Sequence, residues 1–269
     1  MEIRSLADTS LSDIVACLLE AFEGYFVKMP ESIDYWAERF RGARVEYDLS
    51  FGMFDKDQLV GFIMNGIDVQ EEELTAFNTG TGVIPAYRGQ KVVDRIYTHA
   101  LPHLKKRGVQ NCRLEVIQAN DRAIRVYERI GFHKIKSLLS FRGDCKVENT
   151  SLTQSQVKLS SIENLIRQKE QFYSWDFTYE AISKNETSFQ CYIIDQYDKS
   201  YYIINPERNM LVHYELPVEA LPALFSTISS QCENIRLVNV DAARVKFIDA
   251  LAELGFENYI NQYEMMMEM

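Results

Sequence analysis

The feature that most constrains the fold is the order of apolar patterns in the first half of the chain. Strand-like runs lie near residues 2–4, 50–54, 59–69, 75–84 and 112–117, and helical spacing lies near residues 11–22, 33–40, 93–104 and 120–130. Two closing strands are expected up to residue 142. The order β-α-α-β-β-β-α-β-α-β-β predicts an α/β (α+β) fold, a mixed twisted sheet flanked by helices.

The composition limits the location and the binding partners that are expected for this protein. Hydrophobic residues make up 46% and charged residues 25% of the 269 residues, and no apolar run is long enough to span a membrane. A formal net charge of −10 disfavours a nucleic-acid partner. Five scattered cysteines argue against both a disulfide framework and a zinc site. We therefore expect a cytoplasmic protein that binds no membrane, no nucleic acid and no metal.

A strand, a proline and a helix follow one another in TGTGVIPAYRGQKVVDRIY, residues 79–97. A loop that leads into a helix presents backbone N–H groups without helical acceptors, so it can bind phosphate. Arg88 and Lys91 would add positive charge, and Gly89 would let a ligand approach the backbone. Taken alone, the pattern is better explained by a capped helix that follows a turn.

The run Val-x-Pro-x-Tyr-Arg-Gly in this segment resembles the acyl-CoA loop of the GNAT superfamily of N-acetyltransferases, whose pattern is Gln/Arg-x-x-Gly-x-Gly/Ala. Arg88 and Gly89 fill the first two positions, whereas Lys91 and Val93 stand where small residues are expected. The resemblance implies that acetyl-CoA binds to this loop. The residues that it assigns to the cofactor here are Val83, Ile84, Arg88, Gly89, Gln90, Lys91, Val92 and Val93.

A second motif lies downstream in LEVIQANDRAIRVYERIGF, residues 114–132. Asn120, Ala123, Tyr127 and Gly131-Phe132 match the GNAT signature Asn-x-x-Ala-x-x-x-Tyr-x-x-x-Gly-Phe. Ala123 and Tyr127 share one helix face, which the resemblance places against the pantetheine and sulfur of the cofactor, with Asn120 on the cofactor amides. From the residues alone, Asn120 is equally an N-cap, and Tyr127 can be a half-buried core aromatic. The resemblance covers roughly residues 1–143.

The chemistry of acetyl transfer requires a base and an acid. An amine attacks a thioester only when it is neutral, whereas its unperturbed pKa is about 10, so a carboxylate must remove a proton. The resemblance implies that Tyr127 is the acid that protonates the leaving thiolate. It also implies that the backbone N–H of Val83 donates a hydrogen bond to the oxyanion.

The base is less clearly marked. Many relatives have a glutamate on the strand that leads into the loop, but residues 78–81 here are Asn-Thr-Gly-Thr. Glu115, in Leu-Glu-Val, has the placement found in ribosomal-protein N-terminal acetyltransferases and is our candidate. A strand glutamate paired with an arginine or a backbone amide is an equal alternative, and Glu23 and Glu31 are lesser candidates.

The second half repeats part of this pattern. Residues 111–132 and 234–256 both begin Asn-x-Arg-Leu and end with an amphipathic helix and Gly-Phe. Aligned from Gly-Phe, Leu251 replaces Tyr127 and Arg244 replaces Asn120, and the loop equivalent is expected at residues 205–207. We expect a catalytic GNAT-like domain at 1–143, a connection at 144–160, and a degenerate, partial GNAT-like domain without a cofactor site at 161–269.

Together these patterns predict an N-acetyltransferase that moves an acetyl group from acetyl-CoA to a primary amine of a small molecule or peptide by direct attack, with Tyr127 as general acid. The alternative is a non-catalytic acyl-CoA-binding protein with a sensor or regulatory role. The second half would cover the acceptor cleft or form the surface of a homodimer.

Overall fold

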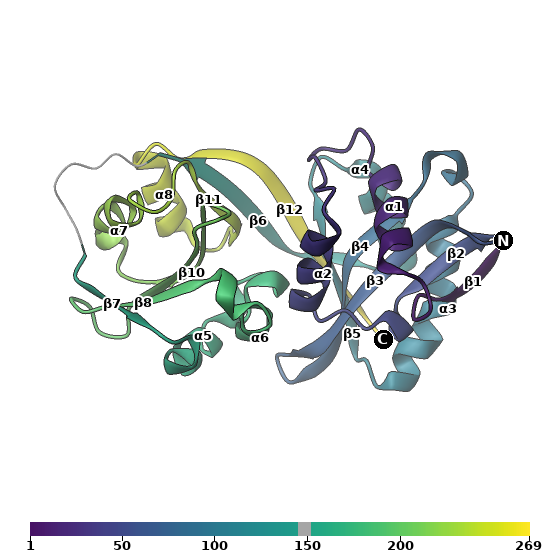
Figure 1. Cartoon of the computed structure of the whole chain (residues 1–269), viewed down its shortest axis with the longest axis horizontal. Coiled ribbons are helices and arrows are strands. Elements are labelled where there is room, and N and C mark those ends of the chain that lie inside the picture. The colour runs from purple at the N-terminus through teal and green to yellow at the C-terminus, as the bar shows by residue number, and fades with distance from the viewer. Residues whose placement is uncertain (145–151) are drawn as a thin grey trace. The chain divides into compact units, whose positions relative to one another are not determined.

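The computed structural model describes residues 1–144 and 152–269, which form two compact units (Figure 1). Unit 1 consists of Met1–Val116, Asn120–Ile135 and Glu264–Met269, and unit 2 consists of Ile117–Ala119 and Lys136–Tyr263. The last residues of the chain therefore fold with its first ones. Within the described ranges, no helix is long and apolar enough to cross a membrane.

Unit 1 contains the helices and strands that the apolar patterns predict. The helices of unit 1 are α1 (Leu11–Ala21), α2 (Ile33–Gly42), α3 (Val92–Arg107) and α4 (Asp121–Ile130), with 3-10 turns η1 (Tyr47–Leu49) and η2 (Pro85–Tyr87). Its strands are β1 (Glu2–Ser5), β2 (Phe51–Asp55), β3 (Gln58–Gln70), β4 (Glu73–Val83) and β5 (Asn111–Ile117). Ser10 and Ser32 start α1 and α2, because their hydroxyls accept the amides of Asp13 and Tyr35.

The sheet of unit 1 opens between strands β4 and β5. Its order is β1-β2-β3-β4-β5, followed by the C-terminal part of β12 (Glu257–Glu268). Strands β1 to β4 are antiparallel, whereas β4 and β5 are parallel and pair only from Thr75–Asn111 to Asn78–Leu114. Because β4 continues to Val83 and β5 to Ile117, the two strands separate toward their carboxyl ends.

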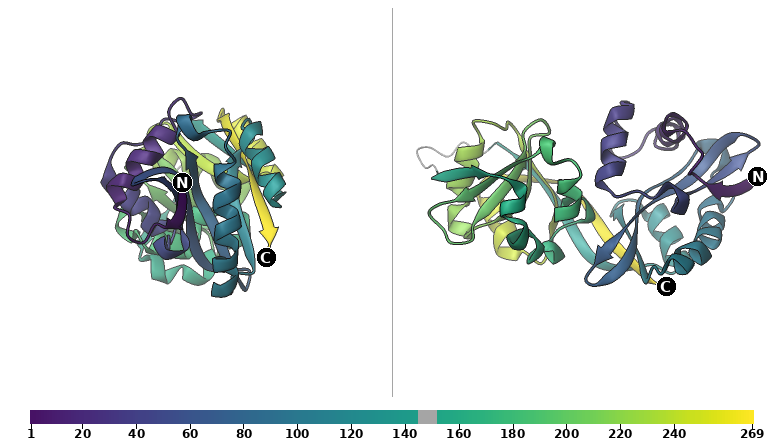
Figure 2. Two further views of the ribbon diagram at one scale, coloured as in Figure 1. Left: turned by 90° about the vertical axis from the view of Figure 1, so that its right-hand side faces the viewer. Right: turned by 60° about the horizontal axis from the view of Figure 1, so that its bottom comes forward.

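Helices cover both faces of this sheet (Figure 2). A Cβ on Gly82 of β4 would lie 2.9 Å from the Cβ of Ala21 in α1, and one on Gly61 of β3 would lie 2.8 Å from Cγ1 of Val92 in α3. Gly82 is paired with Phe62, the neighbour of Gly61, so the two glycines face opposite sides. Helices α1 and α2 therefore cover one face, and α3 and α4 cover the other.

The expectation of two closing strands after α4 is wrong. A single strand, β6 (His133–Gly143), follows α4, and the strand beside β5 comes from the end of the chain. Nη1 of Arg113 in β5 lies 3.3 Å from Oε1 of Glu264, 151 residues away, and both side chains are buried. The N–H of Met269 donates to the carbonyl of Gln110 at 2.9 Å. The apolar pattern of a strand does not specify its neighbour, because backbone pairing is open to any strand.

Unit 2 repeats the central arrangement of unit 1. Its strands are ordered β6-β11-β10-β9-β8-β7, with β7 (Gln154–Val157), β8 (Gln190–Ile194), β9 (Tyr201–Asn205), β10 (Met210–Glu215) and β11 (Ile235–Asp241). Strands β8 to β10 are antiparallel, and β10 is parallel to β11. Helix α7 (Leu221–Ile228) follows β10 and α8 (Val245–Glu253) follows β11, as α3 and α4 follow β4 and β5. The repeat seen in the sequence is therefore also a repeat of structure.

Part of the segment expected to be a connection, residues 144–160, is a strand of unit 2. Residues 145–151 lie outside the described residues, but Gln154–Val157 form β7, and Leu152 and Leu159 are buried. Helix α5 (Glu163–Arg167) follows, between the 3-10 turns η3 (Leu159–Ser161) and η4 (Glu170–Phe172). Four further short elements of unit 2 are η5 (Trp175–Phe177), α6 (Tyr179–Ser183), η6 (Glu186–Ser188) and η7 (Val218–Ala220).

Candidate active site

The loop between β4 and α3 presents free backbone amides at a helix N-terminus. Gly89 has φ 80°, and Lys91, the N-cap of the 16-residue helix α3, has φ 54° and ψ 34°. The amide of Arg95 donates to the carbonyl of Lys91, at 3.0 Å. Within the described part of the chain, the amides of residues 89–93 have no hydrogen-bond acceptor, so they are available to an anion.

Arg88 shapes this loop through its side chain. Its Nε donates to the carbonyl of Val83 at 3.2 Å, and its Nη2 donates to the carbonyl of Ala21, the last residue of α1, at 3.0 Å. Its own amide donates to Pro85 O at 3.2 Å and is therefore not available to a ligand. The guanidinium thus links the C-terminus of α1 to the end of β4. A positive charge is favourable at the C-terminus of a helix. The binding of phosphate by Arg88 stays a prediction.

Val83 directs its N–H toward the open side of β4. The amide of the next residue, Ile84, donates to Val60 O on β3 at 3.1 Å. In an antiparallel ladder, successive residues direct their amides to opposite sides. The N–H of Val83 therefore faces the side from which β5 has separated, where it can donate to a ligand oxygen that gains negative charge. The side chain of Ile84 is buried, at 2% exposure, in the core beneath the loop.

Asn120 is the N-cap of α4, as one of its two predicted roles requires. Its Oδ1 accepts the amide of Ala123 at 3.1 Å, which satisfies an otherwise unpaired helix amide. Its Nδ2 donates to the hydroxyl of Tyr25 at 3.4 Å. Tyr127 follows Ala123 by one turn and is 9% exposed. The contact of Asn120 and Ala123 with a cofactor stays a prediction.

Tyr127 keeps its proton over the physiological pH range. Burial raises the pKa of its phenol to about 12, while an interaction with Thr81 lowers it and nearby Tyr25 adds a smaller increase. A general acid must be protonated at the working pH, so this environment suits the predicted role. The sequence did not indicate Thr81 or Tyr25 as site residues. The aromatic cluster of Phe22, Tyr25 and Phe26 after α1 was an available signal for Tyr25.

Glu115 lies one residue beyond the last pair of β4 with β5. Leu114 pairs with Asn78, whose side-chain amide donates to the hydroxyl of Tyr97 in α3. Leu114 therefore faces α3, and Glu115, the next residue, faces the side of α1 and α2. Glu115 thus lies on β5 and faces α1 and α2, whereas Tyr127 lies on α4, which covers the other face of the sheet, and a shared role of the two residues stays a prediction. Glu23, a lesser candidate for the base, is exposed on the segment after α1.

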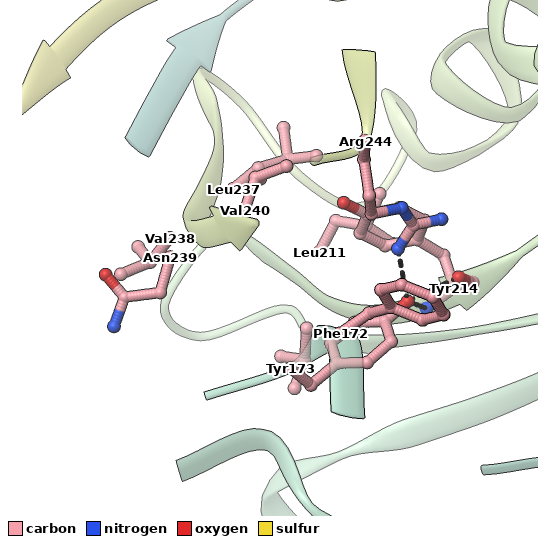
Figure 3. Close-up of a pocket in the computed structure, with 10 residues that line it drawn as sticks. Phe172, Tyr173, Leu211, Tyr214, Leu237, Val238, Asn239, Val240 and Arg244 are labelled. Carbon is pink, nitrogen blue, oxygen red and sulfur yellow. Dashed lines mark hydrogen bonds between the residues drawn. The ribbon is translucent and has the colours of Figure 1, made fainter. Parts of the chain in front are cut away.

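The corresponding opening of unit 2 is filled by side chains (Figure 3). The cavity lined by β10 and β11 measures about 10 Å³, room for a single water. Arg244, at the position of Asn120, donates to the hydroxyl of Tyr173 at 2.9 Å and lies 3.4 Å from Oε1 of Glu215. Leu251, at the position of Tyr127, is fully buried.

The loop equivalent in unit 2 was expected at the wrong place. Asn205-Pro206-Glu207 form the turn between β9 and β10, whereas the segment that leads from β10 to α7 contains Leu216 and Pro217. Proline has no N–H to donate, so Pro217 interrupts the run of backbone amides in this segment. No group of three metal-ligating side chains occurs in the described ranges, and the absence of a metal stays a prediction.

The model of the Acetyltransferase (GNAT) family matches residues 13–132, which extend from α1 to the end of α4. These residues therefore resemble a GNAT domain. The chain is 30% identical over 95 residues to N-alpha-acetyltransferase 30 of Schizosaccharomyces pombe, a match that covers 35% of this chain and 63% of that protein. It is 31% identical over 100 residues to the ribosomal protein bS18-alanine N-acetyltransferase of Escherichia coli, over 37% of this chain and 65% of that enzyme. The chain thus spans less than two thirds of the length of either relative.

A solved structure also resembles the part of the chain outside residues 13–132. A tandem GNAT protein from the clavulanic acid biosynthesis pathway superposes with a TM-score of 0.69, at 15% identity, over 99% of this chain and 98% of that one. At this identity the similarity concerns the fold alone. It confirms the predicted mixed sheet flanked by helices and a GNAT-like fold in the second half.

Proposed function

We propose that this chain transfers an acetyl group from acetyl-CoA to a primary amine. Acetyl-CoA, the co-substrate of the GNAT family, supplies the acetyl group as a thioester. The observation that carries the proposal is the opening between β4 and β5, which is flanked by free amides at residues 89–93. Because anions bind at helix N-termini, these amides fit a pyrophosphate, and the left-handed backbone at Lys91 keeps them pointing the same way as a glycine would.

Three groups of the chain would carry the chemistry at this opening. The N–H of Val83 would donate to the carbonyl oxygen as it becomes negative. Glu115 would take a proton from the attacking amine, directly or through water, and Tyr127 would give a proton to the departing sulfur. Burial supports the last role, since a phenol with a pKa of about 12 stays protonated at the pH where the amine reacts.

The α-amine of a peptide is the acceptor that we propose to test first. The two relatives at 30% and 31% identity are named for acetylation at an N-alpha group and at the alanine of a ribosomal protein. The formal net charge of −10 would attract cationic amines of either kind, including small molecules. A second candidate function, an acyl-CoA-binding protein without turnover, is favoured by the absence of a carboxylate on β4 at residues 78–81.

Calorimetric titration with acetyl-CoA followed by a thiol-release assay tests the proposal. We expect one CoA per chain, because the opening of unit 2 is filled by Arg244 and Tyr173. Thiol release should depend on an added amine from a panel of peptides and small amines, with peptides that carry a free α-amine compared against the same peptides with blocked N-termini. No binding at millimolar acetyl-CoA would refute the proposal, and binding without amine-dependent release would support the non-catalytic alternative.

A further inference from the structure

The helix that follows the free loop amides carries an acid in its first turn. Asp94 is the third residue of α3, after Val92 and Val93, and Lys91 is the N-cap. An acidic side chain at this position can reach back to the amide of the N-cap residue, as in a capping box. It would then occupy an amide of the row at residues 89–93 and bring a negative charge to it. The acid therefore competes with a phosphate for the loop unless another group holds it.

Arg129 of α4 holds the carboxylate of Asp94. Its Nε donates to Oδ1 at 2.6 Å, and its Nη2 donates to Oδ2 at 2.8 Å. Both carboxylate oxygens are thus bonded to one planar guanidinium, a bidentate geometry that fixes the orientation of the acid. In this orientation neither oxygen accepts the amide of Lys91, and the loop amides stay free.

The pair acts on the charge beside the loop more than on the stability of the fold. The pKa of the Asp94 carboxyl is lowered, chiefly by its hydrogen bonds to Arg129, so the acid is ionised at neutral pH. The side chain of Arg129 is 51% exposed and that of Asp94 is 23% exposed. An ion pair that is open to solvent contributes little to stability, because water screens the charges and the side chains lose freedom.

We propose that Arg129 is a positioning residue that keeps Asp94 from competing with the pyrophosphate of acetyl-CoA for the loop amides. This inference rests on the proposed function, in which those amides bind the cofactor. Arg129 acts through Asp94 and not by contact with the ligand. Its guanidinium cancels the negative charge and holds the carboxylate off the amide of Lys91. The first turn of α3 can therefore contain an acid, which favours the helix, and still bind an anion.

Arg129→Gln, which keeps the aliphatic stem and removes the charge, is the main test. We expect the dissociation constant for acetyl-CoA, measured by calorimetry at low salt, to rise about fivefold, because the freed carboxylate opposes an anion at the helix N-terminus. The melting temperature of the free protein should be nearly unchanged. At about 1 M salt, where the Debye length is about 3 Å, the difference in affinity should largely disappear. Arg129→Lys, which keeps the charge, should recover most of the affinity.

The double variant Asp94→Ala, Arg129→Gln separates this role from direct binding of the ligand. If Arg129 acts through Asp94, removal of the acid should restore the wild-type dissociation constant. A double variant as weak as Arg129→Gln would overturn the proposal, because Arg129 would then contact the ligand or support the fold. Arg125→Gln, exposed one turn earlier on α4, is the matched control for the loss of one positive charge and should stay within about twofold of wild type. An equal loss in this control would also overturn the proposal.

The result for the wild type distinguishes this inference from the proposed function. A wild type that binds acetyl-CoA, with Arg129→Gln binding equally well, would overturn the positioning role alone and leave a pair that only complements the ends of two helices. Should Arg129→Gln fail to fold, Asp94→Ala decides, since it should bind acetyl-CoA at least as tightly as wild type, and weaker binding would overturn the role. A wild type that binds no acetyl-CoA would refute the proposed function and this inference with it.

Discussion

The hydroxyl of Tyr25 accepts a hydrogen bond from the side-chain amide of Asn120, at 3.4 Å and 95 positions away in the sequence. Tyr25 lies on the segment between α1 and α2 and packs edge-to-face against Phe22 and Phe26, at centroid distances of 4.8 and 5.1 Å. The same segment exposes Phe26 and Val27, at 53% and 40%. The bond thus joins Asn120, which is predicted to contact the cofactor, to an exposed apolar segment.

Tyr25→Phe should weaken the acceptor complex while leaving the fold intact. The change removes one hydroxyl that accepts from Asn120 and frees the segment that carries Phe26. We expect the KM for a peptide acceptor to rise about fivefold, the equivalent of ~1 kcal/mol, with a smaller change for acetyl-CoA. Steady-state kinetics with each substrate varied in turn measure both effects. Equal KM values for wild type and variant would mean that the bond has no part in binding.

Lys91→Gly should stabilise the protein and preserve cofactor binding. Lys91 has φ 54°, a left-handed conformation that costs a non-glycine residue ~1 kcal/mol or more. Part of this gain is offset by the flexibility of glycine when unfolded, so we expect a net increase of ~0.5–1 kcal/mol in the free energy of unfolding. Lys91→Ala is the control, since it removes the same charge but keeps the strained backbone. Urea unfolding and acetyl-CoA titration check both variants, and a large loss of binding in each would show that the charge matters more than the conformation.

Glu115→Gln should remove the base without removing side-chain volume. We expect kcat to fall about 10²-fold and the rate to lose the acidic limb that protonation of Glu115 produces, because glutamine does not titrate. Glu23→Gln, on the exposed segment after α1, is the matched control and should stay within about twofold of wild type. pH–rate profiles from pH 5 to 9 report the result. A Glu115→Gln protein that is destabilised but has an unaltered profile would show a structural glutamate.

Deleting residues 264–269 should unfold unit 1, although these residues are the last in the chain. The deletion removes the strand beside β5 and leaves the guanidinium of Arg113, which is 7% exposed, without Glu264. Arg113 keeps its ion pair with Glu71, at 2.7 Å, so we expect the loss of stability to come chiefly from the missing strand. A truncated protein that ends near Gly143 lacks the same strand, so we expect it to bind no acetyl-CoA, although it contains both GNAT motifs. Thermal shift with acetyl-CoA is the measurement, with Glu264→Gln as a milder control, and a stabilisation equal to that of the full chain would contradict the expectation.

Alkaline pH should destabilise the fold through its buried thiols. Burial raises the pKa of Cys17 and of Cys112 to about 12 from an unperturbed 9.0. A raised folded pKa means that the native state holds the proton more tightly, so this stability is full below the unfolded pKa and is lost as pH rises toward 12. We expect the free energy of unfolding, measured by urea denaturation, to be constant from pH 7 to 8 and to fall above pH 9, by up to ~1.4 kcal/mol per pH unit for each thiol. The double variant Cys17→Ala, Cys112→Ala should show a shallower fall, and an identical slope would rule out this cause.

The sequence by itself determined the elements of the first half and its similarity to one family. The helices and strands up to Ile130 follow from apolar periodicity, and Asn120 follows from its place before an amphipathic helix, where a capping oxygen is needed. The two motifs around Arg88 and Tyr127 sufficed to predict the GNAT family that residues 13–132 match. These features are local, because each depends on residues within one helix or one loop.

Only the tertiary structure decided which distant groups meet. The strand beside β5 comes from the end of the chain, and the contacts of Asn120 with Tyr25 join segments far apart in the sequence. The alignment of Asn78 with Thr81 depends on a bulge at Thr79, which no apolar pattern marks. The physical reason is the same in each case. Backbone pairing and side-chain hydrogen bonds accept any partner of suitable geometry, so the choice among partners is made by the packing of the whole unit.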